Sequence, residues 1–264
     1  MTSLLAVENL SKRFGGLQAV ADVSLMVNTG EICSVIGPNG AGKTTLFNMI
    51  SGVLRPSGGR IVFDGTDMAS VSPSRFAAKG IGRTFQNLAL FKHGTVVENI
   101  LTGRHTHLRS NVLNAVIFFG RTRREEIEAR QRVEEIIEFL EIEHIRDAIV
   151  GTLSYGQQKR VELARALACE PKLLLLDEMV SGMNQEETED IARFVLDIRE
   201  ELGITVLMIE HEMRIVMDIY DRVHVLNFGR KIAEGTPAEV RRDPAVAEAY
   251  LGGHRTEAAA QVGA

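Results

Sequence analysis

The sequence predicts an α/β fold built on a largely parallel sheet, with a helical segment inserted into the chain. Two apolar runs of strand length, 31–36 and 173–176, each lead into residues typical of a ligand site, a glycine-rich loop and a pair of acidic residues. Ligand sites of parallel sheets lie at the carboxyl ends of the strands. Residues 87–151 change to helices and loops, with many charged residues. We therefore expect one α/β core with a helical insertion.

The composition is that of an ordinary globular domain. The chain has 264 residues, of which 45% are hydrophobic and 25% charged, so it can bury a full core. A net charge of −5 gives no reason to expect nucleic acid as a partner. We see no N-terminal signal and no run near the ~18 apolar residues of a membrane span. We therefore expect a cytoplasmic protein that reaches a membrane only through a partner, with Cys33 and Cys169 as reduced core residues.

Two strand-like runs fill residues 4–27, on either side of a turn that begins at Phe14. In the second run Val23, Leu25 and Val27 alternate with Asp22, Ser24 and Met26, which is the pattern of a sheet with one covered face. Phe14 has two interpretations at this point. It stacks on an adenine face, because it shortly precedes the glycine-rich loop, or it is an ordinary core residue.

The glycine-rich loop fits the G-x-x-x-x-G-K-[ST] pattern of a phosphate-binding loop. Its residues are Gly37, Pro38, Asn39, Gly40, Ala41, Gly42, Lys43, Thr44 and Thr45. The glycines let backbone N–H groups surround the phosphates, and a helix beginning at Lys43 adds the positive end of its dipole. We expect Lys43 to reach the β- and γ-phosphates and the Thr44 hydroxyl to bind Mg²⁺. A chance glycine-rich turn would lack the flanking strand and helix.

The insertion begins after a short strand near 80–85 that ends at Gln86. A glutamine there either orients water or completes a metal shell, or it is a surface amide. Within the insertion, Val133, Ile136, Ile137 and Leu140 follow helical spacing. The apolar run 112–119 is either core of this lobe or a docking surface.

The second half of the chain returns to alternating strands and helices. Four leucines at 173–176 precede Asp177 and Glu178, at the sheet edge where we expect the ligand. Asp177 fits a metal-associated carboxylate, and Glu178 is placed to accept a proton from an attacking water. The strand at 204–209 ends in Glu210 and His211 on the same edge. A hairpin follows at 223–234, and the tail 252–264 is expected to be loose.

The run Leu153-Ser154-Tyr155-Gly156-Gln157-Gln158, followed by a helix, resembles the signature motif of ABC-type ATPases. Ser154, the Gly156 backbone and the start of that helix form an anion-binding end. The resemblance, which covers residues 4–251, implies that Ser154, Gly156 and Gln157 meet ATP held by a second ATPase subunit, a homo- or heterodimer partner. ATP and Mg²⁺ are the cofactors that it implies.

The same resemblance assigns roles to single residues. It implies that Phe14 stacks on adenine, that Glu178 is the catalytic base, and that His211 contacts the γ-phosphate. Gln86 would sense both the metal and the transmembrane partner, so the implied metal ligands are Thr44, Gln86 and Asp177. It also implies one domain over 1–251. The expected parts are a nucleotide-binding core with an antiparallel β subdomain at 1–86 and 152–235, a helical subdomain at 87–151, and a C-terminal helical segment at 236–251.

Finer motifs resemble the ATP-binding subunits of branched-chain amino acid importers. They are the runs 13–20, 83–86, 209–213 and 243–252, together with Tyr155 in the signature. This resemblance implies permease subunits, an extracytoplasmic solute-binding protein and a peripheral location on the inner face of the membrane. Alternatives are lipopolysaccharide export, a soluble non-transport ABC ATPase, which the acidic balance disfavours, and a regulator that hydrolyses poorly.

One departure concerns the residue after the expected catalytic base. The family usually has proline there, whereas this chain has Met179, and the loop 180–185 also differs from the common form. Because methionine removes a restraint on φ, we expect slower or less tightly coupled hydrolysis.

Overall fold

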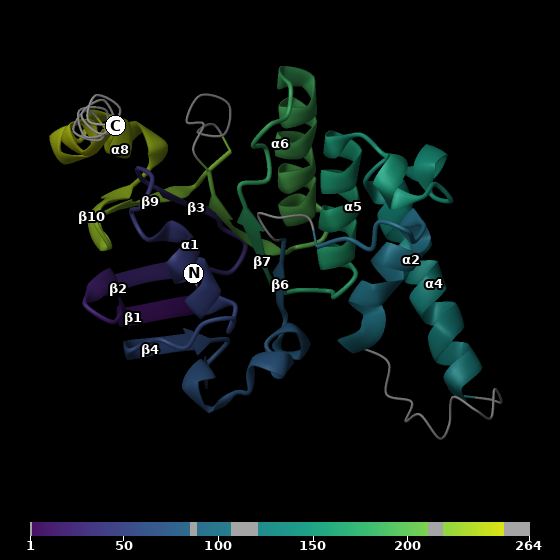
Figure 1. Cartoon of the computed structure of the whole chain (residues 1–264), viewed down its shortest axis with the longest axis horizontal. Coiled ribbons are helices and arrows are strands. Elements are labelled where there is room, and N and C mark those ends of the chain that lie inside the picture. Colours follow the sequence, from purple (N-terminus) through teal and green to yellow (C-terminus); the bar gives the residue numbers. More distant parts are fainter. Residues whose placement is uncertain (1, 85–88, 107–120, 211–218, 251–264) are drawn as a thin grey trace. The chain divides into compact units, whose positions relative to one another are not determined.

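The computed structural model describes residues 2–84, 89–106, 121–210 and 219–250. These residues form two compact units (Figure 1). Unit 1 consists of Met1–Pro73 and Leu175–Ala264, and unit 2 of Ser74–Leu174. The expected domain boundaries at 86, 151, 235 and 251 stay a prediction, and the run 112–119 and the tail 252–264 lie outside the described residues.

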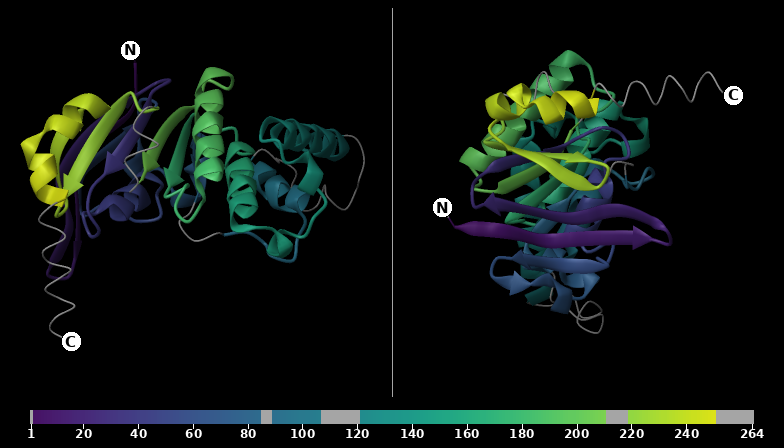
Figure 2. Two further views of the ribbon diagram at one scale, coloured as in Figure 1. Left: turned by 90° about the horizontal axis from the view of Figure 1, so that it is seen from above. Right: turned by 90° about the vertical axis from the view of Figure 1, so that its left-hand side faces the viewer.

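The first sheet of unit 1 is antiparallel, with strand order β2-β1-β4-β5. Its strands are β1 (Ser3–Phe14), β2 (Leu17–Asn28), β4 (Gly58–Phe63) and β5 (Thr66–Asp67). The central strand β1 lies beside the long β2 (Figure 2), with Leu5 opposite Val27 and, on its other side, Phe63. Leu5, Val7 and Leu10 are buried. In β2 the buried Val23, Leu25 and Val27 alternate with less buried residues, so one face lies in the core, whereas β1 shifts register between Val7 and Leu10. The expected pair of N-terminal strands is confirmed.

The second sheet carries the phosphate loop. Its strands in unit 1 follow the order β10-β9-β3-β8-β7, with bounds β3 (Ile32–Ile36), β7 (Leu173–Asp177), β8 (Thr205–Ile209), β9 (Arg222–Asn227) and β10 (Arg230–Gly235). Strand β7 crosses the boundary between the units at Leu175. Strand β3 pairs in parallel with both β8 and β9, and β10 closes the edge as an antiparallel hairpin. Strands β3, β7 and β8 are buried along their whole length, as the apolar runs predicted.

Among the described residues, the helices of unit 1 include α1 (Lys43–Ile50), α6 (Gln185–Glu200) and α8 (Pro237–Arg242), and residues 244–250 are also helical. A short 3₁₀ turn, η1 (Met68–Ser70), follows β5, and η2 (Pro73–Arg75) lies at the unit boundary. Helix α6 begins after Asn184, whose side chain accepts a hydrogen bond from the Glu187 N–H while the Glu187 side chain accepts one from the Asn184 N–H. Its apolar stripe packs against β8, with Ile191 and Phe194 buried.

Unit 2 is mainly helical. It contains η3 (Ala77–Lys79), β6 (Ile81–Arg83), α2 (Val96–Leu101), η4 (Thr102–Thr106), α4 (Arg121–Phe139), η5 (Glu143–Ile145), η6 (Val150–Thr152) and α5 (Tyr155–Leu167). Helices α2, α4 and α5 pack on one another. The predicted stripe Val133, Ile136, Ile137 and Leu140 is buried among them. The Gly80 carbonyl, just before β6, accepts backbone hydrogen bonds from Lys172 and Leu173.

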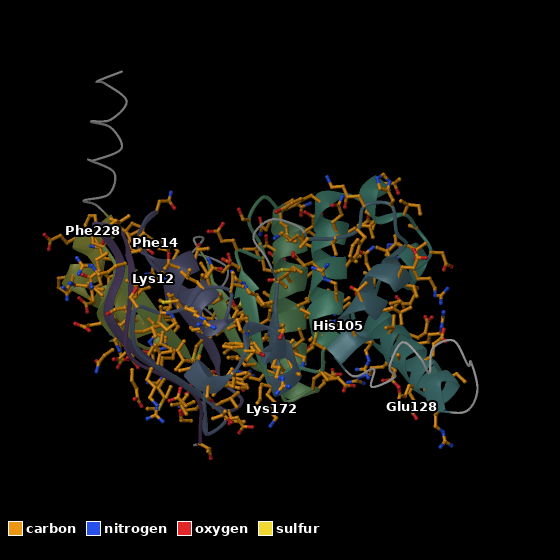
Figure 3. All side chains as sticks on the ribbon, turned by 60° about the horizontal axis from the view of Figure 1, so that its bottom comes forward. Lys12, Phe14, His105, Glu128, Lys172 and Phe228 are labelled. Atoms are coloured by element: carbon orange, nitrogen blue, oxygen red, sulfur yellow. The ribbon has the colours of Figure 1, made fainter. Side chains whose placement is uncertain are left out.

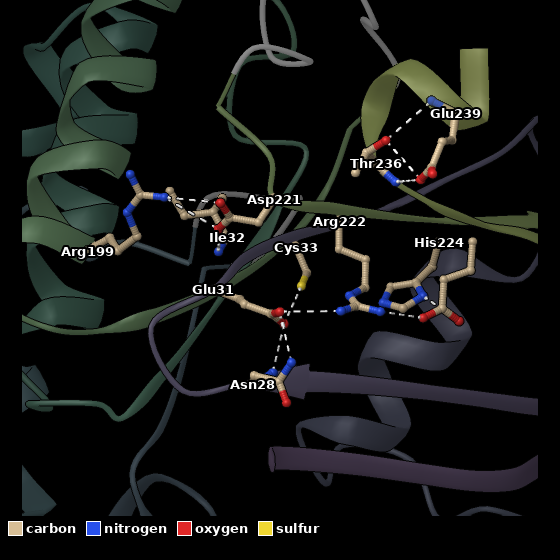
Figure 4. Close-up of polar contacts among 11 residues, drawn as sticks. Asn28, Glu31, Ile32, Cys33, Arg199, Asp221, Arg222, His224, Thr236 and Glu239 are labelled. Carbon is tan, nitrogen blue, oxygen red and sulfur yellow. Dashed lines mark hydrogen bonds and ion pairs between the residues drawn. The ribbon is translucent and has the colours of Figure 1, made fainter. Parts of the chain in front are cut away.

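The ends of β3 and β9 are joined by polar contacts (Figure 4). Glu31 accepts hydrogen bonds from the backbone and side chain of Asn28 and lies 3.5 Å from the Arg222 guanidinium. Cys33 is a free, buried thiol, and burial raises its pKa well above the ordinary value. Among the described residues, no helix is long and apolar enough to cross a membrane.

Candidate active site

The loop between β3 and α1 is closed by one of its own side chains. The Lys43 Nζ donates a hydrogen bond of 2.6 Å to the Gly37 carbonyl and one of 3.1 Å to the Pro38 carbonyl. The Ala41 N–H also donates to Pro38, at 3.1 Å. The expected loop residues 37–45 therefore form one compact turn that ends at the start of α1.

Two glycines let this loop lie close to neighbouring backbone. A Cβ on Gly37 would overlap the Leu226 carbonyl oxygen in β9. A Cβ on Gly42 would lie 2.5 Å from the Ala19 carbonyl oxygen in β2. Gly42 also has φ of 98°, in the left-handed region that favours glycine. No side chain caps α1 and its first turn holds no acidic residue. The helix start therefore presents N–H groups and a positive dipole end suited to phosphate.

Lys43 is a buried cation that faces two acidic residues. The residue is only 5% exposed. Burial lowers the pKa of Lys43 to about 8, while the charges of Glu178 and Asp177 act in the opposite direction. The structure therefore brings together the phosphate-loop lysine and the two carboxylates at the end of β7, as the shared sheet edge predicted.

The two carboxylates have different surroundings. Asp177 is the fully buried last residue of β7, and Glu178 is half-buried. The Glu178 backbone has φ of 50°, and its N–H donates a 3.0 Å hydrogen bond to the Ile209 carbonyl at the end of β8. A buried carboxylate together with the Thr44 hydroxyl at the start of α1 is an oxygen donor set of the type Mg²⁺ prefers. Within the described ranges, no group of three or more His, Cys, Asp or Glu residues could hold a metal.

Sequence reasoning missed the role of Glu210 at the end of β8. Its Oε1 accepts hydrogen bonds from the backbone N–H groups of Met179, at 2.9 Å, and Val180, at 3.4 Å. Glu210 is 3% exposed and Met179 is fully buried. The available signal was an acidic residue directly after a wholly apolar strand, where burial of the carboxylate demands hydrogen-bond donors.

Phe14 lies at the end of β1, with 48% of its surface exposed (Figure 3). The Lys12 Nζ stands 5.2 Å from the centre of its ring. An exposed ring does not fill the core, so the structure disagrees with the core interpretation of Phe14. Its exposure leaves a ring face that a nucleotide base could contact.

The expected signature residues lie in unit 2, at the start of α5. Ser154 caps the helix by accepting a hydrogen bond of 3.3 Å from the Gln157 N–H, and the Gln157 side chain accepts one of 3.1 Å from the Ser154 N–H. Gly156 is buried and Tyr155 is 44% exposed. This reciprocal cap fixes the helix start. Two other expected site residues, Gln86 and His211, lie outside the described residues.

Comparison with known families agrees with these motifs. A family model described as "ABC transporter" matches residues 20–181. The chain belongs to the ABC transporter family. A second model, "Branched-chain amino acid ATP-binding cassette transporter", matches residues 230–256. The expected ABC ATPase fold and ATP hydrolase activity are confirmed, and nucleotide binding follows from both.

Relatives of this ABC ATPase match it over nearly their whole length. The high-affinity branched-chain amino acid transport ATP-binding protein BraF of Pseudomonas aeruginosa is 43% identical, over 94% of this chain and 98% of the relative. The lipopolysaccharide export system ATP-binding protein LptB of Haemophilus influenzae is 38% identical, over 95% of this chain and 98% of the relative. Among solved structures, the ADP conformation of MJ1267, an ATP-binding cassette of an ABC transporter, has a TM-score of 0.83 at 38% identity, over 96% of this chain and 100% of that one.

Proposed function

We propose that this ABC ATPase energises an importer of branched-chain amino acids. The observation that carries the proposal is the match of residues 230–256 to the branched-chain amino acid cassette model, because this segment lies outside residues 20–181, which the general ABC transporter model matches. The similarity to BraF, 43% identical, points the same way. Lipopolysaccharide export is the second candidate, favoured only by the 38% identity to LptB.

The predicted site residues divide the work of ATP hydrolysis. The phosphate loop and the start of α1 bind the phosphates, and Lys43 exchanges its bonds to the Gly37 and Pro38 carbonyls for the β- and γ-phosphates. Phe14 offers its exposed ring to adenine. Glu178 accepts the proton of the attacking water. Thr44 and Asp177, with Gln86, would hold Mg²⁺, which neutralises charge on the phosphates.

A second ATPase subunit completes each site. Ser154 and the start of α5 form an anion-binding end that serves the nucleotide of the partner subunit. Closure of the two subunits then makes hydrolysis conditional on assembly. Permease subunits, gripped near Gln86 and the helical segment 87–151, would hold the pair at the inner membrane face, and an extracytoplasmic binding protein would deliver the solute.

Hydrolysis by the full chain tests the site assignments. Phosphate release at saturating MgATP should rise more steeply than linearly with chain concentration, because two half-sites must meet. The variant Glu178→Gln should lose nearly all turnover and keep nucleotide binding, measured with fluorescent MANT-ATP. Strictly linear turnover, even with the partner ATPase present, would contradict assembly of the site from two chains.

A transport assay on the assembled complex tests which solute it carries. Vesicles would hold this chain, a second ATPase and permease subunits, with the binding protein and labelled leucine on the opposite side. We expect ATP-dependent leucine uptake that Glu178→Gln abolishes. Extraction of lipopolysaccharide without leucine uptake would instead favour the export candidate.

A further inference from the structure

Glu178 adopts a backbone conformation that its side chain does not favour. Its φ of 50° lies in the left-handed region, which is uncommon for residues other than glycine, asparagine and aspartate. A residue keeps such a conformation only when surrounding contacts impose it. The direction of the Glu178 side chain depends on the backbone conformation of this residue. Contacts that fix the backbone therefore also fix the direction of the side chain.

Three backbone N–H groups in a row are held by the end of β8. Glu178 donates to the Ile209 carbonyl at 3.0 Å, and Met179 and Val180 donate to a single oxygen of the Glu210 carboxylate at 2.9 and 3.4 Å. All of these residues belong to unit 1. The end of β8 therefore clamps the segment 178–180 through one backbone and one side-chain acceptor.

The surroundings make the contact between Met179 and Glu210 a strong restraint. Met179 is 0% exposed and Glu210 3% exposed, so water does not compete for the bond. A hydrogen bond from a backbone N–H to a carboxylate is charge-assisted and shorter than a neutral one on average. Only a residue with a backbone N–H can donate this bond, which excludes proline at position 179.

We propose that Glu210 is a positioning residue that holds Glu178 in its catalytic orientation through the N–H of Met179. This inference rests on the proposed role of Glu178 as the base. Methionine in place of proline at position 179 then has two effects on the backbone. It removes the restraint on φ, and its N–H supplies a hydrogen bond to Glu210. Loss of the bond should impair the chemical step more than nucleotide binding, because the phosphate loop is held by other contacts.

A double-mutant cycle on the full-length protein tests the proposal. The variants are Glu210→Ala, Met179→Pro and their combination, with Met179→Leu as a matched control that keeps both the N–H and the apolar volume. Glu210→Gln retains an acceptor oxygen and serves as the conservative rescue. Each variant is compared for kcat and KM of MgATP hydrolysis, MANT-ATP binding and thermal unfolding, with wild type and Glu178→Gln in the same assay.

The expected pattern separates positioning from simple stabilisation. Glu210→Ala should lower kcat by about tenfold or more while KM and MANT-ATP affinity change by less than about twofold. Met179→Pro should also lower kcat, because the lost hydrogen bond to Glu210 outweighs the regained restraint on φ, and the double variant should be no worse than the poorer single one. Met179→Leu should match wild type, and Glu210→Gln should recover most of the activity.

Other results would overturn the proposal. An unchanged kcat in Glu210→Ala would show that Glu210 does not position Glu178. If Glu210→Ala lowered kcat by the same factor in wild type and in the Met179→Pro background, Glu210 would not act through this N–H. Loss in Glu210→Gln as large as in Glu210→Ala would exclude the acceptor role. If Glu178→Gln turned over like wild type, the role of Glu178 itself would fail, whatever the Glu210 variants did.

Discussion

The Lys43 ammonium group donates a 2.6 Å hydrogen bond to the Gly37 carbonyl, so one side chain joins the two ends of the phosphate loop. Lys43 is almost entirely removed from solvent. A buried cation destabilises the fold unless its partners compensate for lost hydration. The low pKa of Lys43, about 8, indicates that compensation is incomplete.

Replacing Lys43 with methionine should therefore separate stability from function. Lys43→Met keeps the stem and removes the charge, so we expect loss of ATP turnover together with a free energy of unfolding at pH 7 that is higher by on the order of 1 kcal/mol. The measurements are phosphate release and urea unfolding without nucleotide. Lower stability of the variant at pH 7 would contradict this account of the buried charge.

The difference in the free energy of unfolding between Lys43→Met and wild type should change with pH in one direction. Because the folded-state pKa of Lys43 is lowered to about 8 from 10.5, the unfolded chain binds more protons between these values. The cost of the buried charge is fully present below pH 8 and falls as pH rises toward 10.5. The stability advantage of Lys43→Met should consequently shrink between about pH 8 and pH 10 in parallel urea titrations.

Ser154 should affect turnover beyond its effect on helix stability. Ser154→Ala removes a helix cap, and Thr95→Ala removes the same type of reciprocal cap from α2 in the same unit. Each loss should lower the free energy of unfolding by about 1 kcal/mol. Only Ser154→Ala should also reduce ATP turnover, by about tenfold or more, because it alone belongs to the proposed anion-binding end. Equal turnover in both variants would argue against that role.

The parts of the site that lie within one contiguous stretch could be predicted from the sequence. Strand, glycine-rich loop and helix follow one another over 31–50, so their geometry depends on local backbone preferences and on one motif. The placement of Asp177 near Lys43 also followed, because parallel strands bring their carboxyl ends to one sheet edge. The stripe of α4 is an equally local feature.

Contacts between distant residues could not be predicted in the same way. The bond from Met179 to Glu210 joins positions 31 residues apart, and the register of β7 and β8 that creates it is set by packing of the whole sheet. The left-handed φ of Glu178 has no local signal, since glutamate rarely adopts it. The exposure of Phe14 likewise depends on where β1 ends, and two alternatives were open for it.

Gly42 should tolerate substitution less well than a glycine in an open turn. Alanine at position 42 would meet both an unfavourable φ of 98° and the Ala19 carbonyl at 2.5 Å from its Cβ. Gly203, with φ of 66° and nothing within 4 Å of a Cβ, is the matched control. We expect Gly203→Ala to cost about 1 kcal/mol and Gly42→Ala clearly more, by urea unfolding without nucleotide. Equal costs would show that the loop moves away from β2 freely.

Glu234 in β10 is a carboxylate whose ionisation should stabilise the fold. It lies 3.6 Å from the Nδ1 of His224, 2.5 Å from the Nζ of Lys231 and 3.1 Å from the guanidinium of Arg222. The contact with His224, followed by those with Lys231 and Arg222, holds the pKa of Glu234 well below its usual range. Since the folded-state pKa is lowered, the stabilisation is fully present above the ordinary glutamate pKa and is lost progressively as pH falls from there through the lower folded-state pKa.

Glu234→Gln should therefore destabilise the protein at pH 7, and this effect should shrink as pH falls below the ordinary glutamate pKa. We expect the free energy of unfolding to fall by roughly 1–3 kcal/mol at pH 7, because the neutral amide removes the negative charge that Arg222 and Lys231 share. Glu239→Gln is the control, since Glu239 is also a carboxylate with a lowered pKa but caps the exposed start of α8, where glutamine is an accepted substitute. Urea unfolding from pH 7 to pH 3 should narrow the difference between wild type and Glu234→Gln, while the control stays near wild type throughout. A difference for Glu234→Gln that does not change with pH would show that the stabilisation comes from packing rather than from the charge.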